Sequence, residues 1–95
     1  LKVEEITLIR ADYGVIFGYD KANKRHVLNQ SSLIEVQEIL NPKQFFKINR
    51  SEIVNRNFIE RISRYTKNTM AIHLKFIELK TSQKTTAAFN SWMGL

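Results

Sequence analysis

Apolar residues in the first third of the chain recur in short runs with the spacing of β-strands. The segment 6–11 begins with alternating apolar and polar residues, and Val15 to Tyr19 is a run of β-branched and aromatic residues. Both patterns are typical of strands. The D-Y-G sequence at 12–14 has the composition of a turn, and the polar residues 20–24 predict a second turn before a strand at 25–29. These residues therefore predict strands joined by tight turns.

A helix is predicted for residues 32–40. The S-L-I-E sequence at 32–35 has the form of a capping box, in which the Ser oxygen and the Glu carboxylate each accept a hydrogen bond from a free backbone N–H. Leu33, Val36 and Leu40 then fall on one helical face. Pro42 follows the helix, which ends there because the residue before a proline disfavours helical backbone angles. A helix this short needs tertiary packing to be stable.

The rest of the chain predicts more strands and a second helix. Strands are expected at 45–48, at 53–54 and 58–62, and at 69–74 and 76–79, with turns at 55–57 and 67–68. Phe89, Trp92 and Met93 have the spacing of one helical face, which predicts that Trp92 packs and does not recognise a ligand. Gly94 suits the helix end. The expected fold is mainly β: an elongated antiparallel β-sheet scaffold with two short helices, at about 32–40 and 85–93, in one domain over residues 1–95.

Composition narrows the class of protein. The chain of 95 residues contains no cysteine, so a disulfide framework and a thiol-ligated zinc are excluded. His26 and His73 lie far apart and predict surface positions on strands, not metal ligands. There is no glycine-rich phosphate loop and no suggestive Ser/His/Asp spacing. We therefore expect no enzyme, no cofactor and no metal. Because the chain begins at Leu1 and not at Met, we expect it to be an excised piece of a longer protein.

The net charge of +6 is concentrated in the middle of the chain. Residues 1–40 hold five Lys or Arg and six Asp or Glu, which gives −1; residues 41–70 hold seven and two, which gives +5; residues 71–95 hold three and one, which gives +2. A localised basic region attracts polyanions. An anionic membrane surface would favour cations along an amphipathic helix. Here the cations lie in strand-like and turn-like sequence, which favours nucleic acid.

The segment from Phe45 to Phe58 combines buried-type apolar residues with Lys, Arg and Asn. Arg50 has a planar fork that is able to bond guanine O6 and N7 together. Asn49 suits either adenine or a phosphate, and Lys47, Arg56 and Lys84 suit phosphates. The alternatives are a solvated hairpin with ordinary surface charges and an ion pair between Arg50 and Glu52.

Three further positions have structural interpretations. An Asn in a hairpin, such as Asn55, is more often a turn former than a base reader. Ser82 and Thr85 precede the second helix, whose free N–H groups are able to hold a phosphate, and Lys84 adds charge beside them. For either hydroxyl taken singly, the simpler function is that of an N-cap.

The run F-F-K-I-N-R-S-E-I-V-N at 45–55 resembles the signature of the LytTR family of DNA-binding domains. The resemblance covers nearly the whole chain. It includes the opening strand at 3–11, the helix at 32–40, and the S-Q-K sequence at 82–84 with the helix after it. The chain departs from the pattern at Asn49, where His is commoner, and at Arg10, where an acid is frequent. It also departs at 76–77, where a polar turn is expected.

The resemblance implies a bacterial transcription regulator whose loops enter successive grooves of duplex DNA. The three loops correspond to residues 12–14, 49–51 and 82–85. The DNA-binding residues expected from the charges and the resemblance together are Tyr13, Lys47, Asn49, Arg50, Ser51, Arg56, Ser82, Gln83 and Lys84.

The resemblance also implies partners. Such domains usually follow a phosphoacceptor receiver domain that a sensor kinase controls, and two copies often bind repeated half-sites. We expect a cytoplasmic protein that binds no membrane and whose isolated domain is monomeric off DNA.

Two other classes stay open at this stage. One is a protein-interaction module of similar fold whose basic patch binds an acidic partner. The other is RNA binding by stacked aromatic residues, for which Tyr13, Tyr65 and Phe76 are candidates.

Overall fold

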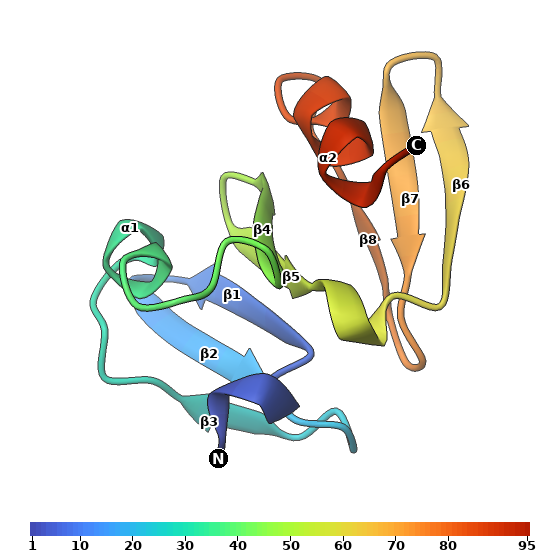
Figure 1. Ribbon diagram of the computed structural model, residues 1–95. Helices are drawn as coiled ribbons and strands as arrows, with labels where there is room; N and C mark the ends of the chain where they lie inside the picture. Colours follow the sequence, from blue (N-terminus) through green and yellow to red (C-terminus); the bar gives the residue numbers. More distant parts are fainter.

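Two antiparallel β-sheets lie side by side in the computed structural model, which describes all 95 residues (Figure 1). The first sheet has the order β3-β2-β1-β5-β4 and the second β6-β7-β8. The strands of the first sheet are β1 (Leu8–Asp12), β2 (Val15–Tyr19), β3 (Arg25–Val27), β4 (Phe45–Asn49) and β5 (Glu52–Asn55). Those of the second are β6 (Arg61–Thr66), β7 (Thr69–His73) and β8 (Glu78–Lys80). The helices are η1 (Val3–Glu5), α1 (Leu33–Gln37), η2 (Arg56–Phe58) and α2 (Thr86–Met93).

The expected fold class is confirmed: the protein is mainly β, with antiparallel sheets and two short α-helices. Its dimensions of 36 × 25 × 24 Å make it moderately elongated. β2 has the predicted bounds, and Tyr13 and Gly14 in the turn before it have φ angles of 48° and 79°. Two consecutive positive φ angles make the tight turn whose twist matches that of an antiparallel hairpin.

Adjacent apolar residues in the first sheet point into two different cores. Ile9 and Ile53 pack in one cluster with the buried residues of α1. Leu8 and Val54, one position away in the same strands, pack in a second cluster with Ile72, Leu79 and Phe89 of the second sheet and α2. Successive strand residues face opposite sides, so a strand covered on both faces reads as a continuous apolar run. The first sheet is therefore the middle layer of the molecule.

The first α-helix is shorter than expected and is capped slightly differently. The Ser32 hydroxyl accepts a hydrogen bond from the Glu35 amide (3.2 Å), as predicted. The Glu35 carboxylate, however, accepts from the hydroxyl and the amide of Ser31, one residue before the cap, and these bonds hold the pKa of Glu35 below its ordinary value. Regular helix ends at Gln37, and turns continue to Leu40.

The strand expected at 58–62 is wrong in its first half. Asn55 is fully buried: its Nδ2 donates to the Ile6 carbonyl (2.8 Å) and its Oδ1 accepts from the Asn57 amide (3.0 Å). These bonds end β5 and begin η2, so the chain leaves the first sheet here and enters the second at Arg61. The structural function predicted for Asn55 is thus confirmed. The last strand also begins two residues later than expected, at Glu78.

α2 docks as its apolar stripe predicts. Phe89 is fully buried, Trp92 and Met93 pack against the same cluster, and Gly94 ends the helix with a φ of 81°. The Trp92 ring lies 5.1 Å from the ring of Phe46, and its Nε1 donates to the Pro42 carbonyl (2.8 Å). The predicted packing of Trp92 is therefore confirmed.

Candidate nucleic-acid interface

The first two of the three predicted loops lie next to each other because β1 pairs with β5. This pairing is antiparallel, with Arg10 opposite Glu52, so the end of β1 lies beside the start of β5. The ladder extends into the turns, where the Ala11 amide donates to the Ser51 carbonyl (2.9 Å). The turn at 12–15 and the turn at 49–52 therefore open on the same edge of the first sheet.

The third loop is attached to the second by hydrogen bonds between the two sheets. The Ser82 amide donates to the Ile48 carbonyl (3.0 Å), and Asn49 Nδ2 donates to the Lys80 carbonyl (2.8 Å). The Thr85 hydroxyl also donates to the Ile48 carbonyl and accepts from the Ser82 amide (3.1 Å). Thr85 precedes α2 but makes no side-chain cap bond, so its hydroxyl holds the loop to β4.

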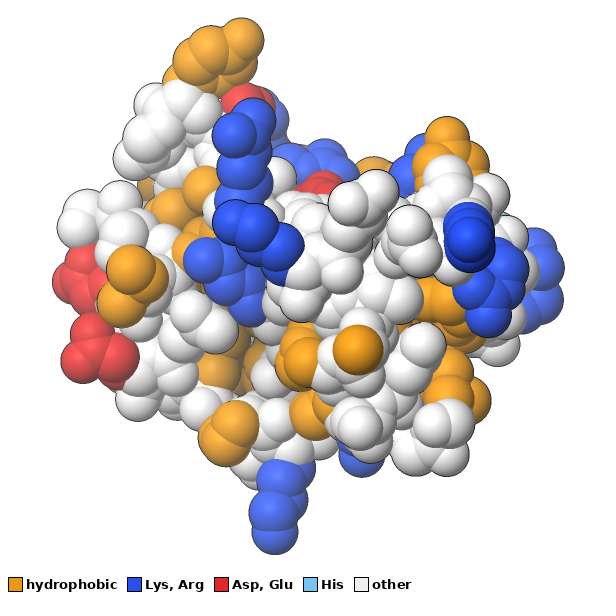
Figure 2. Space-filling view, turned by 90° about the horizontal axis from the view of Figure 1, so that it is seen from above, with side chains coloured by type: hydrophobic (Ala, Val, Ile, Leu, Met, Phe, Trp, Pro, Cys, Tyr) orange, Lys and Arg blue, Asp and Glu red, His pale blue; other side chains and the backbone are white.

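A polar hollow of about 700 Å³ lies between the second and third loops. No apolar side chain lines it, and its lining residues are Lys47, Asn49, Arg50, Ser51, Ser82, Gln83, Lys84 and Thr85. Seven of the nine predicted DNA-binding residues are in this group. In the view from above in Figure 2, Lys and Arg side chains gather left of the centre of this face. Residues far apart in the sequence thus form one basic surface.

The cations of this hollow are not neutralised by the protein. Lys47, Arg50 and Lys84 take part in none of the ion pairs of the structure. Glu52, the carboxylate expected to compete for Arg50, instead accepts from Nε (2.7 Å) and Nη2 (2.5 Å) of Arg10. Arg50 is exposed. Its guanidinium is therefore available to a ligand.

Arg10 neutralises the carboxylate of Glu52, which lies beside the basic surface. Burial lowers the pKa of Arg10, but the hydrogen bonds and the charge of Glu52, with Tyr19, raise it above the ordinary value. Arg10 Cζ lies 5.5 Å from the centre of the Tyr19 ring. The pair spans 42 positions in sequence. Sequence reasoning missed it because only the strand register places the two residues opposite each other.

Asn49 holds the loops together with all of its side-chain hydrogen-bonding capacity. Its Nδ2 donates to Glu52 Oε1 (3.0 Å) as well as to the Lys80 carbonyl. Its Oδ1 accepts from the amide (2.9 Å) and the hydroxyl (3.2 Å) of Ser51. An amide that makes both donor bonds and two acceptor bonds is fully satisfied. The geometry therefore assigns Asn49 to positioning of the second loop.

The other two predicted residues do not line the hollow. Tyr13 is 99% exposed at the tip of the first turn, and its positive φ is uncommon for a residue with a Cβ. Arg56 lies against α2: its Cζ is 4.2 Å from the centre of the Trp92 ring, and its Nη2 donates to the Trp92 carbonyl. The structure leaves Tyr13 beside the hollow and turns Arg56 away from it.

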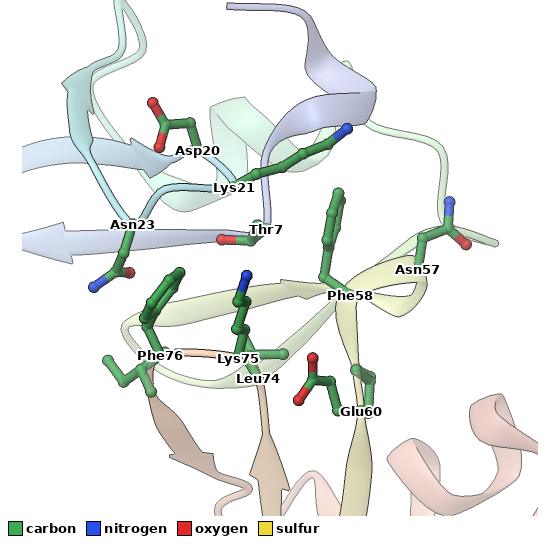
Figure 3. A pocket seen from close by; sticks show the side chains of 12 residues that line it. Thr7, Asp20, Lys21, Asn23, Asn57, Phe58, Glu60, Leu74, Lys75 and Phe76 are labelled. Carbon is green, nitrogen blue, oxygen red and sulfur yellow. The ribbon is translucent and has the colours of Figure 1, made fainter.

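A second cavity lies at the far end of the second sheet. It has a volume of about 270 Å³ and is lined by Thr7, the β2–β3 turn, η2 with the two residues after it, and the β7–β8 turn. Figure 3 shows Phe58, Phe76 and Lys75 among its walls. Lys21 and Lys75 are accompanied there by Asp20 and Glu60. Its charges balance, so it suits a polyanion less than the hollow does.

None of the helices has the length and hydropathy that a membrane-spanning helix requires.

Comparison with known proteins shows the family of this chain. The model of the LytTr DNA-binding domain matches residues 1–94. The fold is similar to the LytTr DNA-binding domain of a protein described as a methyl-accepting/DNA response regulator from Bacillus cereus, with a TM-score of 0.92, 21% identity, and coverage of 100% of this chain and 86% of that one. An uncharacterized response regulatory protein of Vibrio cholerae is 29% identical over 85 residues, which are 87% of this chain but 33% of that protein. The chain belongs to the LytTr family of DNA-binding domains.

Proposed function

We propose that this domain binds duplex DNA sequence-specifically through its turns and serves as the output domain of a bacterial transcription regulator. The observation that carries the proposal is the polar hollow, where Lys47, Arg50 and Lys84 are free of ion pairs. A groove lined by unpaired cations, hydroxyls and amides matches phosphate oxygens and base edges. An apolar docking surface for a protein partner would have a different lining.

The side chains divide into readers and positioners. Arg50 is the base reader, because its planar fork matches guanine and its carboxylate neighbour is occupied by Arg10. Lys47 and Lys84 bind phosphates from the two sides of the hollow. Gln83 supplies an amide at the tip of the third loop.

Hydroxyls and Tyr13 complete the interface. Ser51 and Ser82 line the hollow with their hydroxyls, which add hydrogen bonds to the DNA backbone. Tyr13, at the tip of the neighbouring turn, contacts the adjacent groove. Asn49 acts through the loop that it shapes.

The regulator context is part of the same proposal. The chain spans about a third of the Vibrio cholerae response regulatory protein that it matches. We infer that the domain works in a cytoplasmic protein together with a receiver domain under a sensor kinase. Two copies then occupy repeated half-sites, and the isolated domain is monomeric off DNA.

The proposal is tested by selecting duplexes from a random library and measuring their binding by fluorescence anisotropy. Arg50→Ala is expected to cost about 1–3 kcal/mol on the selected site and much less on mixed-sequence DNA. Lys47→Ala is expected to weaken both about equally. Lys21→Ala, in the β2–β3 turn that lines the far cavity, is the matched control and leaves both unchanged. Absence of duplex binding, or an intact specificity ratio in Arg50→Ala, contradicts the proposal.

A further inference from the structure

A fourth turn opens on the same face as the three loops. This β6–β7 turn comprises residues 66–69. At its end, the Met70 amide donates to the Thr81 hydroxyl (2.9 Å), and the Thr81 amide donates to the Met70 carbonyl (3.0 Å). Thr81 leads directly into the loop at 82–85, so the two connections are neighbours. Figure 1 shows the β6–β7 turn and the β8–α2 loop at the same end of the second sheet.

The fourth turn and its strand β6 carry Lys and Arg residues that lie outside the three loops. Of the seven cations between residues 41 and 70, Arg61, Arg64 and Lys67 lie on β6 and its turn. No Asp or Glu occurs from residue 61 to residue 77. Figure 2 shows a second group of Lys and Arg side chains on the side of this face where the second sheet lies. A polyanion bound in the hollow would therefore find more positive charge beside it.

The turn is ordered by its own hydrogen bonds. The hydroxyls of Thr66 and Thr69 lie 2.6 Å apart across it, and Arg64 Nη1 donates to the Lys67 carbonyl (2.9 Å). The strand register shifts between Arg64 and Thr66, which bends the end of the hairpin. Across β7, Lys80 Nζ of β8 lies 4.3 Å from the centre of the Tyr65 ring of β6. The bond to the Lys67 carbonyl holds the Arg64 guanidinium in place, and the Tyr65 ring holds Lys80, before a ligand arrives.

The fourth turn lies at one end of a row of turns. The whole protein measures 36 Å in its longest dimension, close to one turn of B-form DNA, which is about 34 Å. The hydrogen bonds connect the turns in the order 12–15, 49–52, 82–85 and 66–69. The fourth turn is therefore next to the third loop and farthest from the first, so a duplex bound in the hollow would reach it outside the segment that the hollow contacts.

We propose that the β6–β7 turn, through Lys67 and Arg64, binds backbone phosphates at one flank of the DNA site independently of base sequence. The inference rests on the proposed function and extends its footprint. Phosphate contacts of this kind add affinity and fix orientation but carry no sequence information.

The test compares Lys67→Gln with Lys75→Gln, which removes the same charge from the β7–β8 turn at the other end of the second sheet. The probes are a mixed-sequence 24-base-pair duplex and the selected site. Loss of one phosphate contact reduces the slope of log K against log salt by about 0.9, which is about eightfold in affinity at 0.1 M salt. Lys67→Gln is expected to show this loss on both duplexes, whereas Lys75→Gln and the charge-conserving Lys67→Arg keep wild-type affinity.

Hydroxyl-radical footprinting on the selected site supplies the second readout. Lys67→Gln is expected to lose protection at one flank only, whereas Arg50→Ala loses it inside the site. Equal affinity and equal footprints for Lys67→Gln and Lys75→Gln overturn the inference while the proposed function stands. If the wild-type protein binds neither duplex, the proposed function fails, and the inference fails with it.

Discussion

The hollow between the second and third loops and the cavity at the far end of the second sheet differ in charge balance. Both are concave and both contain cations. Beside the hollow, the Glu52 carboxylate is occupied by Arg10, and the three cations are left unpaired. In the far cavity, Lys21 and Lys75 share the walls with Asp20 and Glu60 and with the rings of Phe58 and Phe76. The comparison teaches that a surface suited to a polyanion is identified by the pairing of nearby carboxylates as well as by the presence of Lys and Arg.

The largest effect is expected on the stability of the fold, from a substitution in the packing of α2. Trp92→Ala removes a ring that contacts Phe46, Phe89 and Arg56, and it is expected to destabilise the fold by about 3 kcal/mol in chemical denaturation. Lys84→Ala, in the loop before α2, is expected to stay within about 0.5 kcal/mol of wild type while it loses DNA affinity. If Trp92→Ala loses DNA binding without loss of stability, Trp92 contacts DNA directly, and this division is wrong.

A smaller effect, on DNA affinity, is expected when a carboxylate beside the hollow loses its ion-pair partner. Arg10→Ala leaves the Glu52 carboxylate without its partner beside Arg50. We expect about tenfold weaker DNA binding, because the unpaired Glu52 carboxylate then repels the DNA phosphates. Two like unit charges about 4 Å apart cost about 1 kcal/mol in water and more near a protein surface. The double variant with Glu52→Gln keeps the oxygen that Asn49 bonds and is expected to regain most of the affinity. If it does not, Arg10 itself binds DNA, and the charge comparison loses its basis.

The smallest effect concerns the far cavity. The hydrogen bond from His26 and the amides of Lys24 and Ala22 lower the pKa of Asp20 below 3.8. A carboxylate with a lowered folded-state pKa stabilises the protein above its unfolded-state pKa, and this stability is lost as the pH falls through the folded value. In thermal melts below pH 4, Asp20→Asn is expected to lose slightly less stability with falling pH than the wild-type protein does. An unchanged acid profile would show that the Asp20 carboxylate contributes no measurable stability. DNA binding at pH 7 is expected to stay at wild-type level.

Local signals in the sequence predicted most of the elements but could not place them against one another. The turn at 12–14, the strand at 15–19 and the stripe of α2 depend on neighbouring residues, and each is present. The expected strand at 58–62 failed because Asn55 bonds to Ile6, 49 positions away. Such a long-range contact leaves no local trace.

Long-range contacts also decide which of the predicted site residues line the hollow and which do not. The family signature and the excess of cations selected residues that the register then brings together, such as Arg50 and Lys84. Arg56 looked equivalent in sequence, but the Trp92 ring and carbonyl hold it. Arg10 drew attention only as a departure from the family pattern, and its partner became visible through the pairing of β1 with β5.

The most direct test of the central claim is an amide chemical-shift titration of the protein with the selected duplex. The account predicts saturable shifts at residues 12–14, 47–51 and 82–85, smaller shifts at 66–69, and little change at 57–60 and 74–77. Shifts that centre on 57–60 and 74–77 and leave the hollow unchanged would contradict it, because DNA would then bind the cavity whose charges balance.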